Sequence, residues 1–158
     1  MTKPLNLKSM TFSTERLHVK AVTHDQDDPM DELLLKIASI LSEGVVESLP
    51  PYFHGIKNTR QAEIWLYKMQ AESCFYGVYE RSSSELIGFL FLHESEDNTA
   101  HLGYLFGEQS WGVGFASELL LGLVRELKLN QLLRTLIAGV DESNVASIRV
   151  LRKGQFTE

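Results

Sequence analysis

The chain has 158 residues, of which 44% are hydrophobic, so its composition excludes a disordered or collagen-like protein and indicates one globular domain over residues 1–158. Its 21 acidic and 15 basic residues give a net charge of −6, which argues against a nucleic-acid partner but not against a small anionic ligand. With one cysteine, Cys74, it can form neither an internal disulfide nor a thiolate metal cage. The sequence shows no signal peptide and no apolar stretch that could span a bilayer, so we expect a cytoplasmic protein with no membrane partner.

The first predicted elements are a strand and two helices. Residues 16–23 alternate between apolar and polar side chains, which predicts a strand. The Asp-Asp-Pro run at 27–29 predicts a helix start, and apolar residues at helical spacing extend that helix to a stop near Gly44. A proline-rich loop at 49–55 follows, and Thr59 is expected to cap the second helix.

Three strands are predicted next. Residues 75–80 and 86–93 are rich in aromatic and branched side chains, and the polar run at 81–85 reads as the hairpin loop between them. A polar turn at 94–98 leads into a third alternating stretch at 100–106. Cys74 precedes these strands and is expected to be a packed thiol rather than a nucleophile.

A helix, a buried strand and a short helix complete the predicted order, over 115–127, 134–140 and 144–153. This order predicts a mixed α/β (α+β) fold in which helices flank one central sheet.

The segment that carries chemical information runs from Gln109 to Ala116, between a strand and a helix. Gly112 and Gly114 allow the backbone to approach a ligand closely, and the free N–H groups of the helix start favour an anion there. The pattern predicts a pyrophosphate cradle, although an ordinary glycine-rich turn before a helix would look the same. It is neither a Walker loop nor a dinucleotide fingerprint, because the required lysine and third glycine are missing.

Several segments, in family order, resemble the GNAT superfamily of acetyl-CoA-dependent N-acetyltransferases, and most closely its RimJ/RimL-type branch. The resemblance covers about residues 11 to 156 and implies a mostly antiparallel sheet, acetyl-CoA as co-substrate and no metal. The segments that carry it are Thr14-Glu15-Arg16-Leu17, Leu86-Ile87-Gly88, Gln109-x-Trp111-Gly112-x-Gly114-Phe115-Ala116-x-Glu118 and Val140-Asp141-x-x-Asn144-x-Ala146-Ser147-x-Arg149-Val150-Leu151.

The resemblance also implies roles for individual residues. Asn144 would bind the pantetheine arm, and Ser147 would protonate the departing thiolate. The remaining cofactor contacts would come from the backbone of one strand and from the two-glycine loop, namely Tyr104, Leu105, Phe106, Gln109, Trp111, Gly112, Val113, Gly114, Phe115 and Ala116.

The implied reaction is direct transfer of the acetyl group to a primary amine. The acceptor could be a protein N-terminus, such as that of a ribosomal protein, or a small amine (a polyamine, amino sugar or antibiotic). A catalytically weak CoA-binding remnant is the third alternative, because the family's last two strands have no counterpart in residues 1–158. The resemblance thus implies that the strand at 134–140 lacks its partner strand, so we expect either a homodimer joined at that edge or a monomer that aggregates easily. The aromatic loop residues Tyr52 and Phe53 could shape the acceptor pocket or simply pack.

His101 stands where the branch usually has a glutamate that helps to take the amine proton. Histidine is able to accept a proton near neutral pH, so His101 is a candidate base. The alternative is a surface histidine at the edge of the sheet, and strand alternation places His101 on the face opposite Tyr104.

Overall fold

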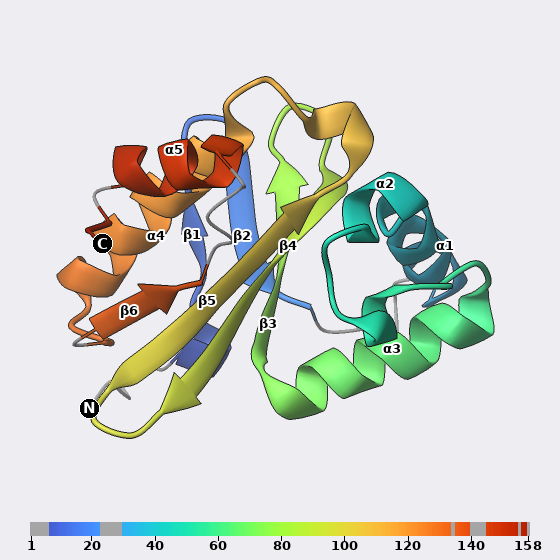
Figure 1. Cartoon of the computed structure of the whole chain (residues 1–158), viewed down its shortest axis with the longest axis horizontal. Coiled ribbons are helices and arrows are strands. Elements are labelled where there is room, and N and C mark those ends of the chain that lie inside the picture. Colours follow the sequence, from blue (N-terminus) through green and yellow to red (C-terminus); the bar gives the residue numbers. More distant parts are fainter. Residues whose placement is uncertain (1–6, 23–29, 134, 140–144, 155, 158) are drawn as a thin grey trace.

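The described part of the chain is built around one sheet with the strand order β1-β2-β3-β4-β5-β6 (Figure 1). A computed structural model describes residues 7–22, 30–133, 135–139, 145–154 and 156–157. Neighbouring strands are antiparallel except β5 and β6, which are parallel. The strands are β1 (Phe12–Ser13), β2 (Leu17–Ala21), β3 (Cys74–Glu80), β4 (Glu85–Ser95), β5 (Thr99–Phe106) and β6 (Thr135–Ala138).

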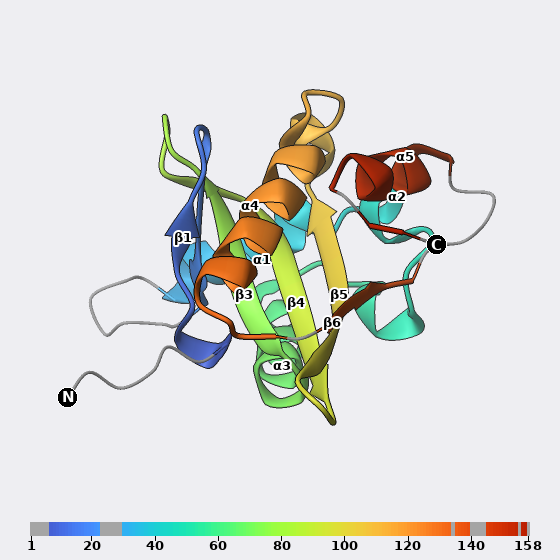
Figure 2. The same ribbon diagram turned by 90° about the vertical axis from the view of Figure 1, so that its left-hand side faces the viewer.

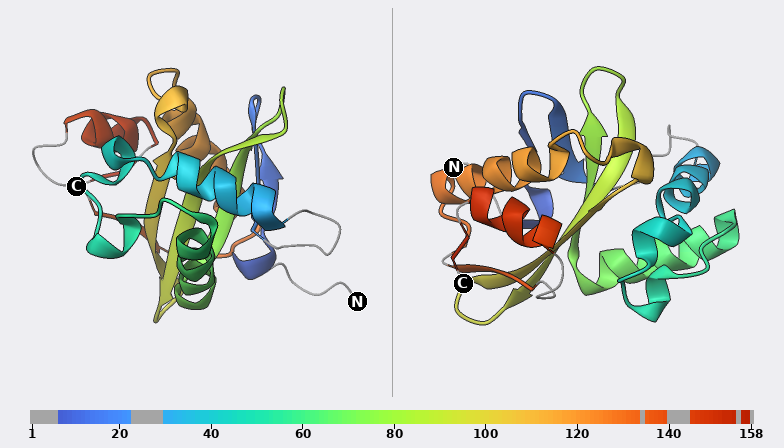
Figure 3. Two further views of the ribbon diagram at one scale, coloured as in Figure 1. Left: turned by 90° about the vertical axis from the view of Figure 1, so that its right-hand side faces the viewer. Right: turned by 45° about the horizontal axis from the view of Figure 1, so that its top comes forward.

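Helices cover both faces of this sheet. Figure 3 shows α1 and α3 in front of one face, with α2 close by, and Figure 2 shows α4 across the other. The last helix, α5, lies beside α4 (Figure 1). The bounds are α1 (Met30–Ile40), α2 (Glu43–Val46), α3 (Thr59–Glu72), α4 (Phe115–Leu129) and α5 (Val145–Lys153).

Two hydrophobic cores lie on opposite sides of β4, whose side chains alternate between them. Leu90 and Leu92 pack with α4, whereas Phe89 and Phe91 pack with α1 and α3. Trp65 of α3 lies 5.5 Å from Phe75 and 5.4 Å from Phe89, measured between ring centroids. Because both faces are covered, β4 reads as a nearly continuous apolar run rather than an alternating one.

The predicted order of long elements is confirmed, and three local expectations are wrong. The second helix is capped by Asn58, whose Oδ1 accepts a hydrogen bond of 2.9 Å from Gln61 N, so that Thr59 is the first helical residue. Gly44 does not end a helix; it lies inside the short α2. The predicted helix start at 27–29 lies outside the described residues.

The third correction concerns the strand predicted as buried at 134–140. The described strand β6 covers Thr135–Ala138, and its residues alternate between exposed and half-buried. The reason is that β6 is the edge strand of the sheet, and of its four residues only Leu136 packs against the hydrophobic core under α4. Within the described residues no strand pairs with the outer side of β6, and association of a second copy there stays a prediction. No helix in those residues has the length and hydropathy needed to cross a bilayer.

Candidate active site

The edge strand β6 pairs with only the first half of β5, which leaves an opening beside the second half of β5. Their parallel pairing runs from Thr99 opposite Thr135 to Leu102 opposite Ala138 and ends there. β5 nevertheless continues to Phe106, still paired with β4 on its other side. The residues of β5 after Leu102 therefore have one backbone edge that no described strand covers.

The hydrogen-bond alternation of β5 decides which backbone groups face this opening. Gly107 N–H donates to Ile87 O at 2.9 Å, so every second residue before Gly107 pairs its backbone with β4. Leu105 is one of these, and its side chain is buried in the core under α1 and α3. The backbone groups of Tyr104 and Phe106 consequently point toward the opening, where Phe106 O accepts a hydrogen bond of 2.8 Å from Trp111 Nε1.

The two-glycine loop lies at the upper end of this opening. Gly112 has φ of 76° and Gly114 has φ of 86°, a region that side chains other than glycine rarely adopt. Helix α4 begins at Phe115, and its first intrahelical bond is Glu118 N–H to Gly114 O at 3.1 Å. The N–H groups of residues 115–117 have no acceptor within the helix, and the helix dipole adds positive potential there. The loop thus has the geometry of an anion site.

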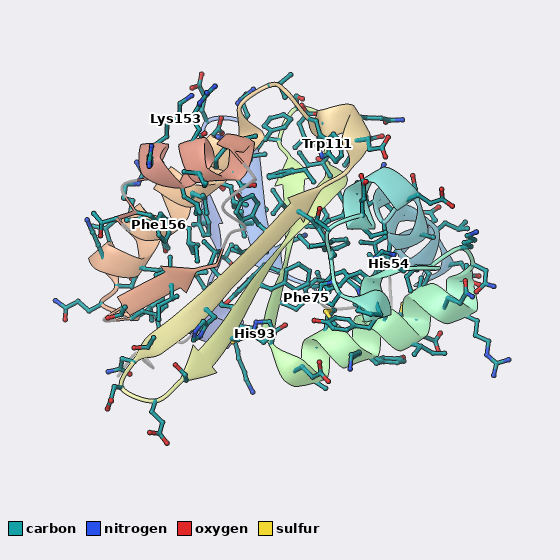
Figure 4. The ribbon with its side chains drawn as sticks, viewed as in Figure 1. His54, Phe75, His93, Trp111, Lys153 and Phe156 are labelled. Carbon is teal, nitrogen blue, oxygen red and sulfur yellow. The ribbon has the colours of Figure 1, made fainter. Side chains whose placement is uncertain are left out.

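The side chains of this segment divide between core and solvent. Phe115 is buried and stacks on Phe106 at 6.1 Å, so it can offer a ligand only its N–H group. Trp111 and Val113 are each 52% exposed, and Figure 4 shows Trp111 at the loop between β5 and α4. Gln109 is exposed and lines a separate hollow of about 570 Å³ that Arg16 and Lys36 share.

A cavity of about 390 Å³ adjoins the opening on its other side. It spans from α5 across the uncovered edge of β5 to the loop before α3, so it touches both faces of the sheet. Its lining is mostly aromatic and aliphatic: Ser48, Leu49, Pro50, Tyr52, Phe53, Met69, Phe91, His93, Leu102, Gly103, Tyr104, Leu105, Ala138, Gly139, Ser147 and Leu151.

Tyr104 and Ser147 meet in this cavity. Their hydroxyl groups are hydrogen-bonded to each other, although one belongs to β5 and the other to α5. Burial raises the pKa of the Tyr104 hydroxyl, and the hydrogen bond with Ser147 offsets part of that rise. The pair therefore carries its protons at neutral pH and can donate one. Asn144, three residues before Ser147 in the sequence, lies outside the described residues.

The two histidines of β4 and β5 lie side by side. His93 is directly opposite His101, which in turn is opposite Ile137 of β6, so the three residues share one face of the sheet. Both histidines are exposed, but only His93 is among the residues that line the cavity. In Figure 4 His93 lies at the part of the sheet that faces α3. The motif position predicts His101 and not His93 as the base, because strand alternation alone does not indicate which end of a face borders a cavity.

A hydrogen-bond network joins two segments of the motif set that lie far apart in the sequence. Glu118 of α4 accepts hydrogen bonds from Thr14 Oγ1, Arg16 N and Arg16 Nε, all in the loop between β1 and β2. Burial opposes ionisation of Glu118, but these bonds and the Arg16 charge outweigh it and hold the pKa of the carboxyl below its usual value. Glu118 is therefore a carboxylate at neutral pH.

Among the other candidates from the sequence, Cys74 is structural, whereas Tyr52 and Phe53 both line the cavity. Cys74 is buried, and burial, together with the nearby Glu94, raises the pKa of its thiol, which disfavours a nucleophilic thiolate. Phe53 packs against Trp65 in the core, while Tyr52 remains 43% exposed beside it. His54 Nε2 is 2.8 Å from Leu49 O and closes the loop between them. The residues that the structure describes contain no group of three or more His, Cys, Asp or Glu side chains suited to a metal ion.

Known proteins share this architecture. A GNAT-family acetyltransferase of Bacillus anthracis superposes with a TM-score of 0.74 at 20% identity, covering 92% of this chain and 82% of that one. The ribosomal-protein α-N-acetyltransferase RimL, solved with coenzyme A, superposes with a TM-score of 0.75 at 16% identity, covering 94% and 84%. Protein YkkB of Bacillus subtilis (strain 168) is 28% identical over 110 residues, which span 65% of this chain and 64% of YkkB.

A comparison with protein families matches almost the whole chain to one family. The description of the matching family is "Acetyltransferase (GNAT) domain", and the match covers residues 16–157. It includes β5 and β6, the two-glycine loop and α5, and it confirms the resemblance drawn from the motifs. The chain therefore belongs to the GNAT acetyltransferase family.

Proposed function

We propose that this protein transfers the acetyl group of acetyl-CoA to a primary amine, as an enzyme of the RimJ/RimL type. The observation that carries the proposal is the uncovered edge of β5, which lies between an anion site at the start of α4 and a cavity of about 390 Å³. A phosphate-bearing donor and an uncharged organic acceptor could meet at that edge from opposite sides.

The donor half of the site suits an acyl-CoA. The pyrophosphate would accept hydrogen bonds from the loop and from the first N–H groups of α4. The pantetheine arm would extend beside β5 like an added strand, pairing with the backbone groups of Tyr104 and Phe106 that point into the opening. The thioester would then lie near Tyr104 and Ser147.

The reaction then needs only backbone and side-chain groups of the protein that are held next to the thioester. The neutral amine attacks the acetyl carbonyl, a backbone N–H of β5 stabilises the oxyanion, and the C–S bond breaks. The thiolate takes a proton from the Ser147 hydroxyl, which regains one from Tyr104 or from solvent. The amine loses a proton to a base or to water, so the protons balance over one turnover. No acyl-enzyme intermediate forms, which agrees with the burial of Cys74.

For the acceptor we propose a protein N-terminal amine next to a small or apolar side chain. Within the described residues, the cavity lining contains no carboxylate, so it offers a polycation no ion pair. Tyr52, Met69 and Phe91 instead present apolar surface to whatever adjoins the amine. RimL, which shares the fold, is a ribosomal-protein α-N-acetyltransferase, and this supports the same choice.

The test is a binding and turnover series. Calorimetry should show binding of acetyl-CoA but not of ATP or NAD. Thiol release should then be measured with peptides that begin with Ala, Ser, Met or Leu, with the same peptides blocked at the N-terminus as controls, and with spermidine and an amino sugar. Mass spectrometry should place the acetyl group on the α-amine. Binding without turnover on any amine would instead support a CoA-binding remnant, and turnover on spermidine alone would contradict the peptide acceptor.

The two histidines make a separate prediction about the amine proton. If His93 is the base, His93→Gln should lower kcat by up to about 10²-fold and remove the acidic limb of the pH profile. If His101 is the base, as expected from the motif position, His101→Gln should do so instead. From the cavity lining we expect the larger effect at His93. Unchanged pH profiles in both variants would leave the proton transfer to water and rule out both residues.

A further inference from the structure

The loop between β1 and β2 is hydrogen-bonded to the first turn of α4. One carboxylate, that of Glu118, accepts bonds of 2.5 Å from Thr14 Oγ1, 2.8 Å from Arg16 N and 2.7 Å from Arg16 Nε. Gly122 lies one turn further along α4 and is buried. A Cβ there would lie 2.5 Å from Thr14 Cγ2, so the helix approaches the strand loop as closely as glycine permits.

The same arginine also holds the two-glycine loop. Arg16 Nη1 donates to Val113 O at 3.0 Å, and its guanidinium lies over the Phe115 ring with Cζ 4.3 Å from the centroid. Its Nη2 lies 3.5 Å from the position that a Cβ on Gly114 would take. The planar guanidinium thus contacts the residue before Gly114 and the residue after it, and it lies beside Gly114.

We propose that Arg16 and Glu118 form a positioning clamp that holds the two-glycine loop in its CoA-binding shape. This inference rests on the proposed function and adds two residues to it that need not touch the reacting atoms. Gly112 and Gly114 are free to adopt many conformations, so something outside the loop must select one. The fixed fork of an arginine can do this, because it bonds the Glu118 carboxylate and the Val113 carbonyl at once.

Charge alone does not account for the pair. A carboxylate in the first turn of α4 repels a pyrophosphate bound there, and Arg16 largely cancels it at 2.7 Å. The net electrostatic benefit to an anion is therefore small, while the geometric constraint on the loop is large. This contrast gives opposite expectations for one variant.

Glu118→Gln separates position from charge. It removes a negative charge beside the anion site, so electrostatics alone would tighten CoA binding. The clamp predicts the opposite, a rise of the CoA dissociation constant by about tenfold, because an amide cannot accept all three bonds. Arg16→Lys keeps the positive charge but not the fork, and it should weaken CoA binding to a similar degree.

Arg81 supplies a matched control. Its Nη1 donates to Thr14 O at 2.8 Å and to Glu15 O at 3.3 Å, so it anchors the same strand loop without contacting the two-glycine loop. Arg81→Lys should bind CoA within about twofold of the wild type while showing whatever loss of stability comes from a looser strand loop. Melting temperatures measured on all variants separate that stability loss from the affinity loss.

Calorimetric titration with coenzyme A closes the test. Weaker binding by Arg16→Lys and Glu118→Gln, but not by Arg81→Lys, is the expected result. A KM for acetyl-CoA that rises while kcat and the acceptor KM stay near wild type would support the same reading. Wild-type affinity in both clamp variants, or tighter binding by Glu118→Gln, would overturn the clamp and leave the proposed function standing. A wild-type protein that binds no coenzyme A would instead overturn the proposed function itself.

Discussion

Gly114→Val should abolish most coenzyme A binding while the protein still folds. Gly114 has φ of 86°, which a β-branched residue adopts only at a cost of roughly 1–2 kcal/mol. The valine would relieve that strain by turning the peptide units on either side, and those units carry the N–H groups meant for the pyrophosphate. Calorimetry should show a dissociation constant at least about tenfold higher than that of the wild type.

Gly55 offers a control with the same backbone demand. Its φ is 72°, and no heavy atom outside its neighbours lies within 4 Å of where its Cβ would be. Gly55→Val therefore imposes similar strain far from the two-glycine loop, and it should lower the melting temperature without changing CoA affinity. A folded Gly114→Val protein that binds coenzyme A as the wild type does would show that the pyrophosphate lies elsewhere.

Helices and strands whose apolar residues recur at a regular spacing were predictable from the sequence. Short elements and helix ends, which depend on contacts with neighbouring segments, were not. The apolar stripe at 115–127 became α4, and the hairpin between 75–80 and 86–93 became β3 and β4. β1 has only two residues, too few for any period to show. The helix cap went to Asn58 rather than Thr59 because both side chains can cap, and the choice depends on backbone angles that the sequence does not display.

The site shows the same division. The two-glycine loop is local and was found from its own residues, whereas every pairing that gives it a context is long-range. Arg16 and Glu118 are 102 residues apart, and each was noticed only as part of a separate motif. Tyr104 was expected to contribute its backbone and Ser147 its hydroxyl, with nothing to indicate that their hydroxyl groups bond each other. Which of two histidines on adjacent strands borders the cavity likewise depends on how far β5 and β6 stay paired.

Ser147→Ala should mainly lower kcat, by up to about 10⁴-fold if no water replaces the hydroxyl. Ser147 lines the cavity at the uncovered edge of β5, where the thioester would lie, so its loss removes the proton for the departing thiolate. Tyr104→Phe keeps the ring and its packing but removes the hydroxyl bonded to Ser147. It should lower kcat less, by about tenfold, because Ser147 could still donate but would no longer be oriented or reprotonated by its partner. The KM for acetyl-CoA should change little in both variants.

A change of leaving group distinguishes acid catalysis from a packing defect. The acetyl ester of a selenol analogue of coenzyme A keeps the pyrophosphate and the pantetheine arm, but it releases a selenolate, which is a much weaker base than the thiolate and needs no proton. The ratio of wild-type to Ser147→Ala rates should therefore shrink with this donor, whereas a misplaced cavity would slow both donors alike. Tyr67→Phe on the exposed face of α3 and Ser83→Ala in the β3–β4 turn are matched controls and should keep wild-type rates. If the Ser147→Ala defect is the same for both donors, Ser147 does not protonate the leaving thiolate, and its hydrogen bond to Tyr104 serves only to hold α5 against β5.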